Sequence, residues 1–384
     1  MRKGKKIILA GALIIVVMFS VLSGCTTTQG GKKEETKKIV DMRGKNIEIP
    51  KDPKRVVIVD KGFIVQTMVA MGIQDKIVAS GGIIQGKEPK PEDRDTLWLF
   101  PKIIQLPNIG YSIGGFNYEA LANANPDLVL WRNSEYIKDK DVTTEAMNKI
   151  ENEFKIPLVV INGPGCYDDV KLETQYEGIK LLGKVFGKEK RAKEMIAYME
   201  EQIDMIKTRT ANIPNDKKPS AMYIGLKGDS SVGSVWGKNF GDAKFSEEIC
   251  NIKNVYDKHE SKKMSSEQII TLNPDAIILC TNSVKPNPKI LSNDPAYKSL
   301  RDVNAVRNGR VTSLGLLTWW GDFRLEFPTI LLISAKSAYP DKFTDIKVSQ
   351  WLDEYHKRLY NISDSQAKEL KGVQYLKWMD ECNF

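Results

Sequence analysis

Histidine and cysteine are both scarce in this chain of 384 residues. The two histidines are His259 and His356, and the five cysteines stand singly, with no Cys-x-x-Cys pair. A zinc or manganese site usually draws on several imidazoles or on closely spaced thiolates, so a histidine-based metal site is disfavoured. Neither histidine adjoins a Gly-x-Ser-x-Gly motif, so a serine hydrolase triad is not indicated.

The chain also lacks a long block of like charge that could bind nucleic acid. It has 57 basic and 49 acidic residues, for a formal net charge of +8. Removing the four basic residues that precede the first apolar stretch leaves 53 against 49, spread along the chain. Charge distributed in this way does not indicate a nucleic-acid-binding surface. The glycines of residues 110–115 lack the Gly-Lys-Ser/Thr ending of a phosphate loop, so nucleotide binding is not expected.

The first 24 residues have the layout of an export signal, a basic head before an uncharged apolar run. Residues 7–22 are a little short for a membrane span of about 20 residues. Leu22-Ser23-Gly24-Cys25 follows and resembles the lipobox of prokaryotic lipoproteins, in which the cysteine is lipidated and becomes the first mature residue. We therefore expect Cys25 to carry lipid, with a plain signal anchor as the alternative. In both cases the rest of the chain works outside the cytoplasm.

Short runs of β-branched and aliphatic residues predict buried strands separated by helical patterns. Each run has the length and content of a strand covered on both faces. Strands that alternate with helices are typical of parallel α/β layers. The predicted strands cover residues 55–60, 127–131, 157–162, 221–225, 275–279 and 311–314.

A repeated segment indicates two lobes built alike. Glu119–Leu130 and Glu267–Ile278 share a glutamate, an Asn-Pro-Asp triplet and an apolar strand at the same spacing, 148 residues apart. In each copy Asn117 or Ser265 can cap a short helix, with the glutamate in its first turn. Proline then stops the helix, and Asn and Asp make the turn. The distance between the copies argues for two lobes rather than a short-period solenoid.

Long helices are expected between the two lobes. Residues 172–186 predict one helix and residues 188–209 a second, with Met195, Met199, Ile203 and Ile206 forming an apolar stripe. Such a stripe predicts packing in a core or between lobes. The predicted organisation is a signal peptide at 1–24, a lipid-anchored linker at 25–38, an N-terminal lobe at 39–172, inter-lobe helices at 173–211, and a C-terminal lobe with a helical extension at 212–384.

The order of several short motifs resembles class III substrate-binding proteins of ABC importers, the receptors for iron-siderophore, haem and cobalamin complexes. The resemblance covers about residues 38 to 345 and rests on residues 41–50 and 52–57, the two Glu-x5-Asn-Pro-Asp segments, residues 182–187 and residues 294–311. It implies two Rossmann-like α/β lobes, each a mostly parallel sheet flanked by helices, joined by a long rigid helix. It also implies a ligand held between the lobes, delivery to a permease and its ATPase, and no catalysis or cofactor.

Candidate ligand contacts follow the predicted strands, because ligands of α/β lobes sit beyond the carboxyl ends of strands. Aromatic rings suit a macrocycle or catecholate, and cationic side chains suit an anionic chelate. The alternative is that a tryptophan belongs to the core or that a cation is merely solvated. The candidates are Tyr111, Tyr167, Trp236, Lys238, Trp319, Trp320 and Arg324.

The resemblance also implies one acidic residue on each lobe that docks to the permease. Glu326 is the candidate in the second lobe, with Asp322 close by in the sequence. In the first lobe the position stays open between Glu88 and Glu92.

The sequence thus predicts a monomeric exported receptor, held by lipid on the outer face of the cytoplasmic membrane, that carries an Fe(III) chelate such as a siderophore. Haem, cobalamin and an oxyanion such as molybdate are alternatives for the same role. A cell-surface hydrolase is the alternative of a different class. It needs a nucleophile beside a base or a carboxylate pair, and the sequence indicates neither.

Overall fold

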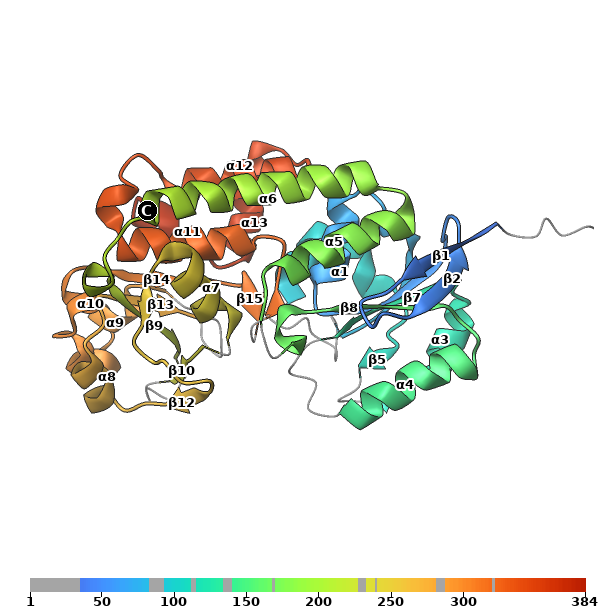
Figure 1. Cartoon of the computed structure of the whole chain (residues 1–384), viewed down its shortest axis with the longest axis horizontal. Coiled ribbons are helices and arrows are strands. Elements are labelled where there is room, and N and C mark those ends of the chain that lie inside the picture. Colours follow the sequence, from blue (N-terminus) through green and yellow to red (C-terminus); the bar gives the residue numbers. More distant parts are fainter. Residues whose placement is uncertain are drawn as a thin grey trace, which may run out of the picture. The chain divides into compact units, whose positions relative to one another are not determined.

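Two separate sheets of mainly parallel strands organise the chain (Figure 1). The computed structural model describes residues 35–82, 93–111, 115–133, 140–167, 170–226, 233–238, 240–280, 287–319 and 322–384. The predicted signal peptide and Cys25 lie outside these residues. Within them, no helix has both the length and the apolar character needed to cross a membrane.

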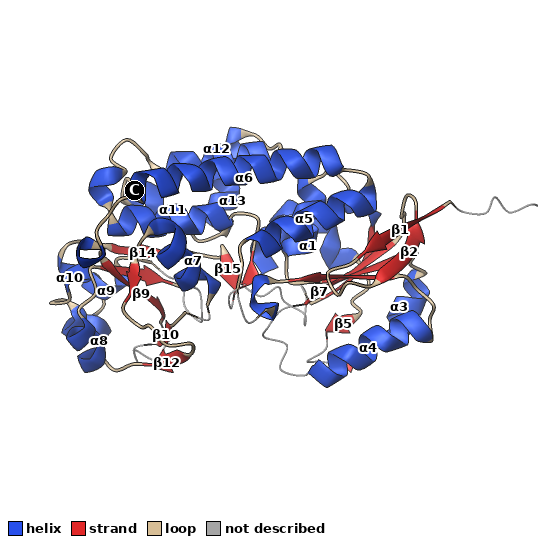
Figure 2. Ribbon diagram, in the orientation of Figure 1, coloured by secondary structure: helices blue, strands red, loops and turns tan. Residues whose placement is uncertain are grey.

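The first sheet has the strand order β4-β3-β7-β8, and all neighbouring strands are parallel. Successive residues of β3 alternate between two cores: Val56 and Ile58 pack with α1 and α5, while Val57 and Val59 pack with α3 and α4. Figure 2 shows these helices on the two faces of the sheet. The elements are β3 (Val56–Val59), α1 (Phe63–Ala70), β4 (Ile77–Gly81), α2 (Arg94–Leu99), α3 (Tyr118–Ala124), β7 (Leu128–Asn133), α4 (Lys140–Asn152), β8 (Leu158–Asn162) and α5 (Glu173–Phe186).

Two hairpins flank the first sheet. The hairpin of β1 (Thr36–Val40) and β2 (Asn46–Pro50) joins the β8 edge, where the Met42 amide donates to the Val160 carbonyl at 3.1 Å. β1 therefore begins inside the range predicted as linker. The hairpin of β5 (Gly110–Tyr111) and β6 (Gly115–Phe116) follows a parallel bridge between Ser80 of β4 and Asn108.

The second sheet repeats the order of the first in its parallel part. Strands β11, β9, β13 and β14 lie in that order, which corresponds to β4, β3, β7 and β8. Antiparallel β10 and β12 are added beside β9. The elements are β9 (Ser220–Gly225), β10 (Ser234–Trp236), α7 (Gly241–Cys250), β11 (Lys253–Asn254), β12 (Ser261–Lys263), α8 (Ser266–Leu272), β13 (Ala276–Leu279), α9 (Ile290–Asn293), α10 (Asn304–Arg307) and β14 (Val311–Ser313).

The repeated segments form the same helix and turn in both lobes, as predicted. The Asn117 side chain accepts from the Ala120 amide and caps α3, and Ser265 forms a reciprocal capping box with Gln268 at α8. Each helix ends at an asparagine in the left-handed conformation, with φ 44° at Asn125 and 41° at Asn273. Asparagine tolerates this conformation better than most residues with a side chain.

The aspartate of each Asn-Pro-Asp triplet ties its strand to the neighbouring strand. The Asp127 carboxylate accepts from the amides of Lys54 and Arg55, just before β3, at 2.6 and 3.1 Å. The Asp275 carboxylate accepts from the amide and the hydroxyl of Ser220, at the start of β9, at 2.9 and 2.8 Å. The triplet thus positions β7 beside β3 and β13 beside β9, a role beyond the turn that the sequence predicts.

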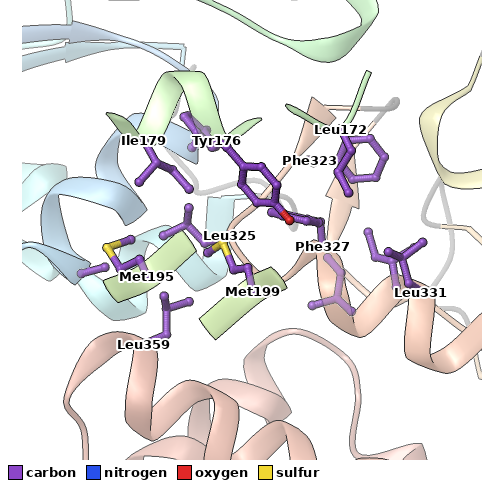
Figure 3. Close-up of a cluster of buried hydrophobic side chains, with 14 of the residues drawn as sticks. Leu172, Tyr176, Ile179, Met195, Met199, Phe323, Leu325, Phe327, Leu331 and Leu359 are labelled. Atoms are coloured by element: carbon purple, nitrogen blue, oxygen red, sulfur yellow. The ribbon is translucent and has the colours of Figure 1, made fainter. Parts of the chain in front are cut away.

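The predicted inter-lobe helix is α6 (Glu189–Thr210), and its apolar stripe is buried. The largest hydrophobic core contains residues of both sheets together with α5, α6, α11 (Phe327–Ala338) and α12 (Val348–Tyr360). Figure 3 shows Tyr176 of α5, Met199 of α6 and Phe327 of α11 within this core. A shared, close-packed core resists relative motion of the two lobes.

The C-terminal helices also contact the first lobe. α12 packs against α1, and α13 (Asp364–Val373) packs against α2, before the short α14 (Trp378–Glu381). The Tyr198 and Tyr355 rings stack between α6 and α12, with centroids 5.2 Å apart. The extension predicted as part of the C-terminal lobe therefore bridges both lobes.

Candidate ligand cleft

A short hairpin joins the two lobes at the carboxyl ends of their strands. It consists of β15 (Thr318–Trp319) and β16 (Asp322–Phe323) and follows β14, the last strand of the second sheet. The Phe323 ring packs on Phe245 of α7, with centroids 5.4 Å apart. The Phe323 carbonyl accepts from the Gln175 side chain of α5 at 3.0 Å. The hairpin thus contacts a helix of each lobe.

Gln175 links this hairpin to a buried arginine of the first lobe. Arg132 in β7 donates through Nη2 to the side-chain oxygen Oε1 of Gln175 at 2.7 Å and through Nη1 to the backbone carbonyl of Asn162 at 3.1 Å. Its guanidinium lies 4.0 Å from the centre of the Phe63 ring. A cation over an aromatic face is favourable, most of all when desolvated. Gln175 therefore connects β7 of the first lobe with β16 of the second through its two amide atoms.

Arg324 reaches from the second lobe into the first and is buried there. Its Nη1 lies 3.1 Å from the Asp95 carboxylate and donates to the Thr96 hydroxyl at 3.1 Å. Burial raises the pKa of Asp95, and the charge of Arg324 opposes that rise. The predicted ligand contact at Arg324 is thus occupied by an ion pair between the lobes.

The backbone makes room for this arginine at Gly62. A Cβ atom on Gly62 would lie 2.2 Å from Arg324 Nη1, and the φ of +132° at Gly62 is one that residues with side chains rarely adopt. On the other side of the pair, Gln66 donates to Asp95 at 3.1 Å and accepts from the Leu325 amide at 3.4 Å.

Glu326 is completely buried, so its carboxylate does not face a partner protein in this structure. It accepts from the Tyr360 hydroxyl at 2.9 Å and from the Gln374 amide at 3.0 Å. Burial raises the pKa of Glu326 to about 7, and the nearby charge of Asp95 adds to the effect. Burial lowers the pKa of His356, 3.8 Å away, to about 3. The candidate acids Glu88 and Glu92 lie outside the described residues, as does the side chain of Asp322.

The aromatic and cationic candidates divide into buried and accessible groups. Trp236 is buried and stacks on Phe240 with ring centroids 5.0 Å apart, which places it in the core. Tyr167 follows β8 and is 39% exposed, and its hydroxyl lies 3.0 Å from the Asn162 amide nitrogen. Lys238 follows β10, is half-buried, and has its ammonium 3.6 Å from the Glu247 carboxylate.

Three further candidates carry no described side chain. The backbones of Tyr111 and Trp319 lie in β5 and β15, and Trp320 lies outside the described residues. In the part of the chain that the structure describes, no cluster of three or more His, Cys, Asp or Glu side chains could hold a metal ion. Cys250, Cys280 and Cys382 are free thiols.

Comparison with known proteins identifies the family of the chain. The family model described as periplasmic binding protein matches residues 57–315. The chain belongs to the periplasmic binding protein family. This confirms the resemblance found in the sequence.

Known members of the periplasmic binding protein family match most of the chain. An uncharacterized ABC transporter substrate-binding lipoprotein of Bacillus subtilis, YvrC, is 25% identical over 350 residues, covering 88% of this chain and 98% of that protein. The petrobactin-binding protein YclQ of the same organism is 25% identical over 332 residues, covering 80% and 90%. A periplasmic solute binding protein of Veillonella parvula has the same fold, with a TM-score of 0.71 at 22% identity, covering 91% of this chain and 100% of that one.

Proposed function

We propose that this protein is an exported receptor that binds an Fe(III) chelate between its lobes and delivers it to the permease of an ABC importer. The observation that carries the proposal is the matched pair of sheets, together with the hairpin of β15 and β16, which contacts a helix of each lobe. Ligands of parallel α/β sheets bind beyond the carboxyl ends of the strands. The role is binding rather than catalysis, and the receptor acts as a monomer.

The ligand class follows from the accessible side chains and from the relatives. Tyr167 offers an exposed ring and Lys238 a cation, which suit an aromatic, anionic chelate. Tyr111, Trp319 and Trp320 are proposed to add further rings. YclQ is named for binding petrobactin, which supports the choice of a metal chelate. Trp236 and Arg324 are buried, so they are not proposed to contact the ligand.

The anchoring of the receptor rests on its N-terminal sequence. We propose that Cys25 carries lipid and holds the protein on the outer face of the cytoplasmic membrane, beside its permease and ATPase. The relative YvrC is named as a lipoprotein, which supports this role. The predicted docking role of Glu326 is not carried forward, because its carboxylate is buried.

A thermal-shift screen tests the ligand class. The panel contains ferric catecholate and hydroxamate siderophores, the same chelators without iron, haem, cobalamin and molybdate. A ligand that binds only the native state raises the unfolding free energy by about 2.7 kcal/mol at 100 times its Kd. We expect a rise in Tm with a ferric siderophore and a smaller rise with its iron-free form. A shift with haem, cobalamin or molybdate alone would contradict the Fe(III) chelate, and no shift with any of them would contradict the receptor role.

Two matched variants then locate the binding site. Lys238→Gln should weaken binding of the ferric chelate about tenfold, because it removes a cation beside the ligand, which is worth about 1.4 kcal/mol. Lys102→Gln, which changes an exposed lysine paired with Asp75, should leave the Kd unchanged. Equal Kd values for both variants, measured by fluorescence titration, would place the ligand away from Lys238.

A further inference from the structure

Five lysines surround the turn between α5 and α6. All five side chains are exposed, and within the described part of the chain none forms an ion pair with a carboxylate. Glu189 stands among them in the sequence, and Glu194, which follows Lys193, lies 3.8 Å from Arg191. We call this surface the basic turn. It consists of Lys180, Lys184, Lys188, Lys190 and Lys193.

Lysines elsewhere on the first lobe are mostly neutralised by acidic neighbours. Lys45 pairs with Glu151 at 2.8 Å, and Lys76 pairs with Asp52 at 2.7 Å. Lys102 likewise lies 3.2 Å from a carboxylate. The basic turn is therefore a region of the first lobe where positive charge is left to face an outside partner.

The chain enters the folded part of the protein at the basic turn. The Lys37 ammonium, at the second position of β1, donates to the Lys184 carbonyl at the end of α5, at 2.9 Å. The Glu35 carbonyl, at the first described residue, accepts from the Lys51 amide at 2.7 Å. Figure 1 shows β1 near this end of α5. The segment that precedes the fold therefore starts from the body close to Lys184.

The segment between Cys25 and Glu35 is short. Eleven residues span at most about 40 Å when fully extended. If Cys25 is in the membrane, Glu35, at the start of the folded part near Lys184, stays within this distance of the lipid headgroups. A short tether keeps the effective concentration of lipid headgroups at this surface high. Even a weak attraction then keeps the surface bound to lipid for much of the time.

We propose that the basic turn rests on anionic lipid headgroups and fixes which side of the receptor faces the membrane. The inference depends on the proposed lipid attachment at Cys25. Lysines near a surface of anionic lipids are attracted within a Debye length, about 8 Å at physiological ionic strength. Lipid is the partner that the tether places beside this surface whether or not a permease is bound. The first lobe then lies against the membrane.

Lysine footprinting tests this orientation on the mature, lipidated chain. The protein is reconstituted into vesicles of neutral phosphatidylcholine, with or without anionic phosphatidylglycerol, and is acetylated with limiting reagent before mass spectrometry. We expect the basic turn to react at least about threefold more slowly in the anionic vesicles and to recover in 1 M salt, where the Debye length is about 3 Å. Four exposed lysines of the second lobe should not change: Lys217, Lys253, Lys262 and Lys298.

Two outcomes would overturn the proposal. The first is equal reactivity of the basic turn in both kinds of vesicle. The second is the same protection in neutral vesicles at every salt concentration, which would reflect the tether alone. The mass of the N-terminal peptide reports acylation of Cys25 separately. A chain without acyl groups overturns both the anchor and the orientation, whereas an acylated chain with uniform reactivity overturns only the orientation.

A matched pair of variants separates charge from position. A quadruple glutamine variant of Lys184, Lys188, Lys190 and Lys193 should lose the lipid-dependent protection of the remaining Lys180. A control variant with glutamine at the four lysines of the second lobe should keep it. All eight side chains are exposed, so both variants should retain the wild-type Tm. Protection of Lys180 that survives in the quadruple variant would contradict the proposal.

Discussion

The two lobes have the same strand order and the same Asn-Pro-Asp turn, but they use the carboxyl ends of their strands differently. In the first lobe, Asp60 follows β3, and its carboxylate accepts hydrogen bonds at the start of α1 from the backbone amides of Gly62, Ile64 and Val65. In the second lobe, the segment after β14 continues into the first lobe, where Arg324 meets Asp95. The repeated part therefore builds each sheet, and the unrepeated part joins the sheets. Four sets of substitutions test this division.

The largest effect is expected at the ion pair that joins the lobes. Asp95→Asn should lower the free energy of unfolding by about 3–5 kcal/mol, because it leaves the Arg324 charge buried without its carboxylate. Asp75→Asn, at an exposed pair with Lys102, should cost about 1 kcal/mol or less. Urea denaturation measures both values. A loss below about 1 kcal/mol for Asp95→Asn would mean that the pair does not hold the lobes together.

The next effect is the pH dependence of stability at the same junction. Burial raises the pKa of Glu326 to about 7 from 4.5, so the native state holds an extra proton at this carboxyl between these values, and the contribution of Glu326 to stability falls as pH rises through this window. His356 acts oppositely: burial lowers its pKa to about 3, so its contribution makes stability rise with pH between about 3 and 6.5.

Glu326→Gln isolates the contribution of the glutamate. Relative to wild type, its free energy of unfolding should increase between pH 5 and pH 8, by about 1.4 kcal/mol for each unit of the pKa shift. Urea titrations at four pH values measure the difference. Glu354→Gln, at an exposed site of α12, is the control for removing a glutamate charge. A difference for Glu326→Gln that does not change with pH would contradict the buried, protonated carboxyl.

A smaller loss of stability is expected when the aspartate of either Asn-Pro-Asp triplet is replaced. Asp127→Ala and Asp275→Ala should each lower the free energy of unfolding by about 1.5–3 kcal/mol, because each leaves donors of the neighbouring strand without their charged acceptor. Thermal denaturation of the two variants side by side measures the costs. A cost in only one lobe would break the equivalence of the two turns.

The smallest effect concerns the helix caps. Asn117→Ala and Ser265→Ala should each cost about 1 kcal/mol. The cost should be larger at Asn117. The bond that Asn117→Ala loses, from the Ala120 amide, is 2.9 Å long, against 3.4 Å for the bond from the Gln268 amide to the Ser265 hydroxyl. Ser265→Ala also keeps the reciprocal bond from its own backbone amide to the Gln268 side chain. The same denaturation curves rank the two variants. A larger cost for Ser265→Ala would contradict this ranking.

The sequence predicts the frame of this protein well because local patterns determine it. The six predicted strands correspond to β3, β7, β8, β9, β13 and β14, with ends that differ by at most two residues. The apolar stripe of α6 and the repeated turns are also found as predicted. These features depend on periodicity, capping and proline, which act within a few residues. The short strands β11 and β12 carry no comparable local pattern.

The candidate site is less predictable because its contacts are distant in sequence. The pair of Arg324 and Asp95 joins residues 229 positions apart, and no local pattern marks Arg324 as buried rather than ligand-facing. Gln175 is the exception, because the sequence pattern places it with Tyr176 and Ile179 on the buried side of α5. A buried polar side chain needs a hydrogen-bonding partner, so its position could have indicated a role. Its two partners, Arg132 and the Phe323 carbonyl, come from different lobes and become visible only in the fold.

Amide hydrogen exchange with and without a saturating ferric siderophore tests most directly that both lobes hold the ligand. The segments to follow are residues 163–167 after β8, residues 236–238 at the end of β10, and residues 318–319 in β15. The two-lobe account predicts slower exchange in the first-lobe segment and in at least one second-lobe segment when ligand is present. Slower exchange confined to a single lobe would contradict it.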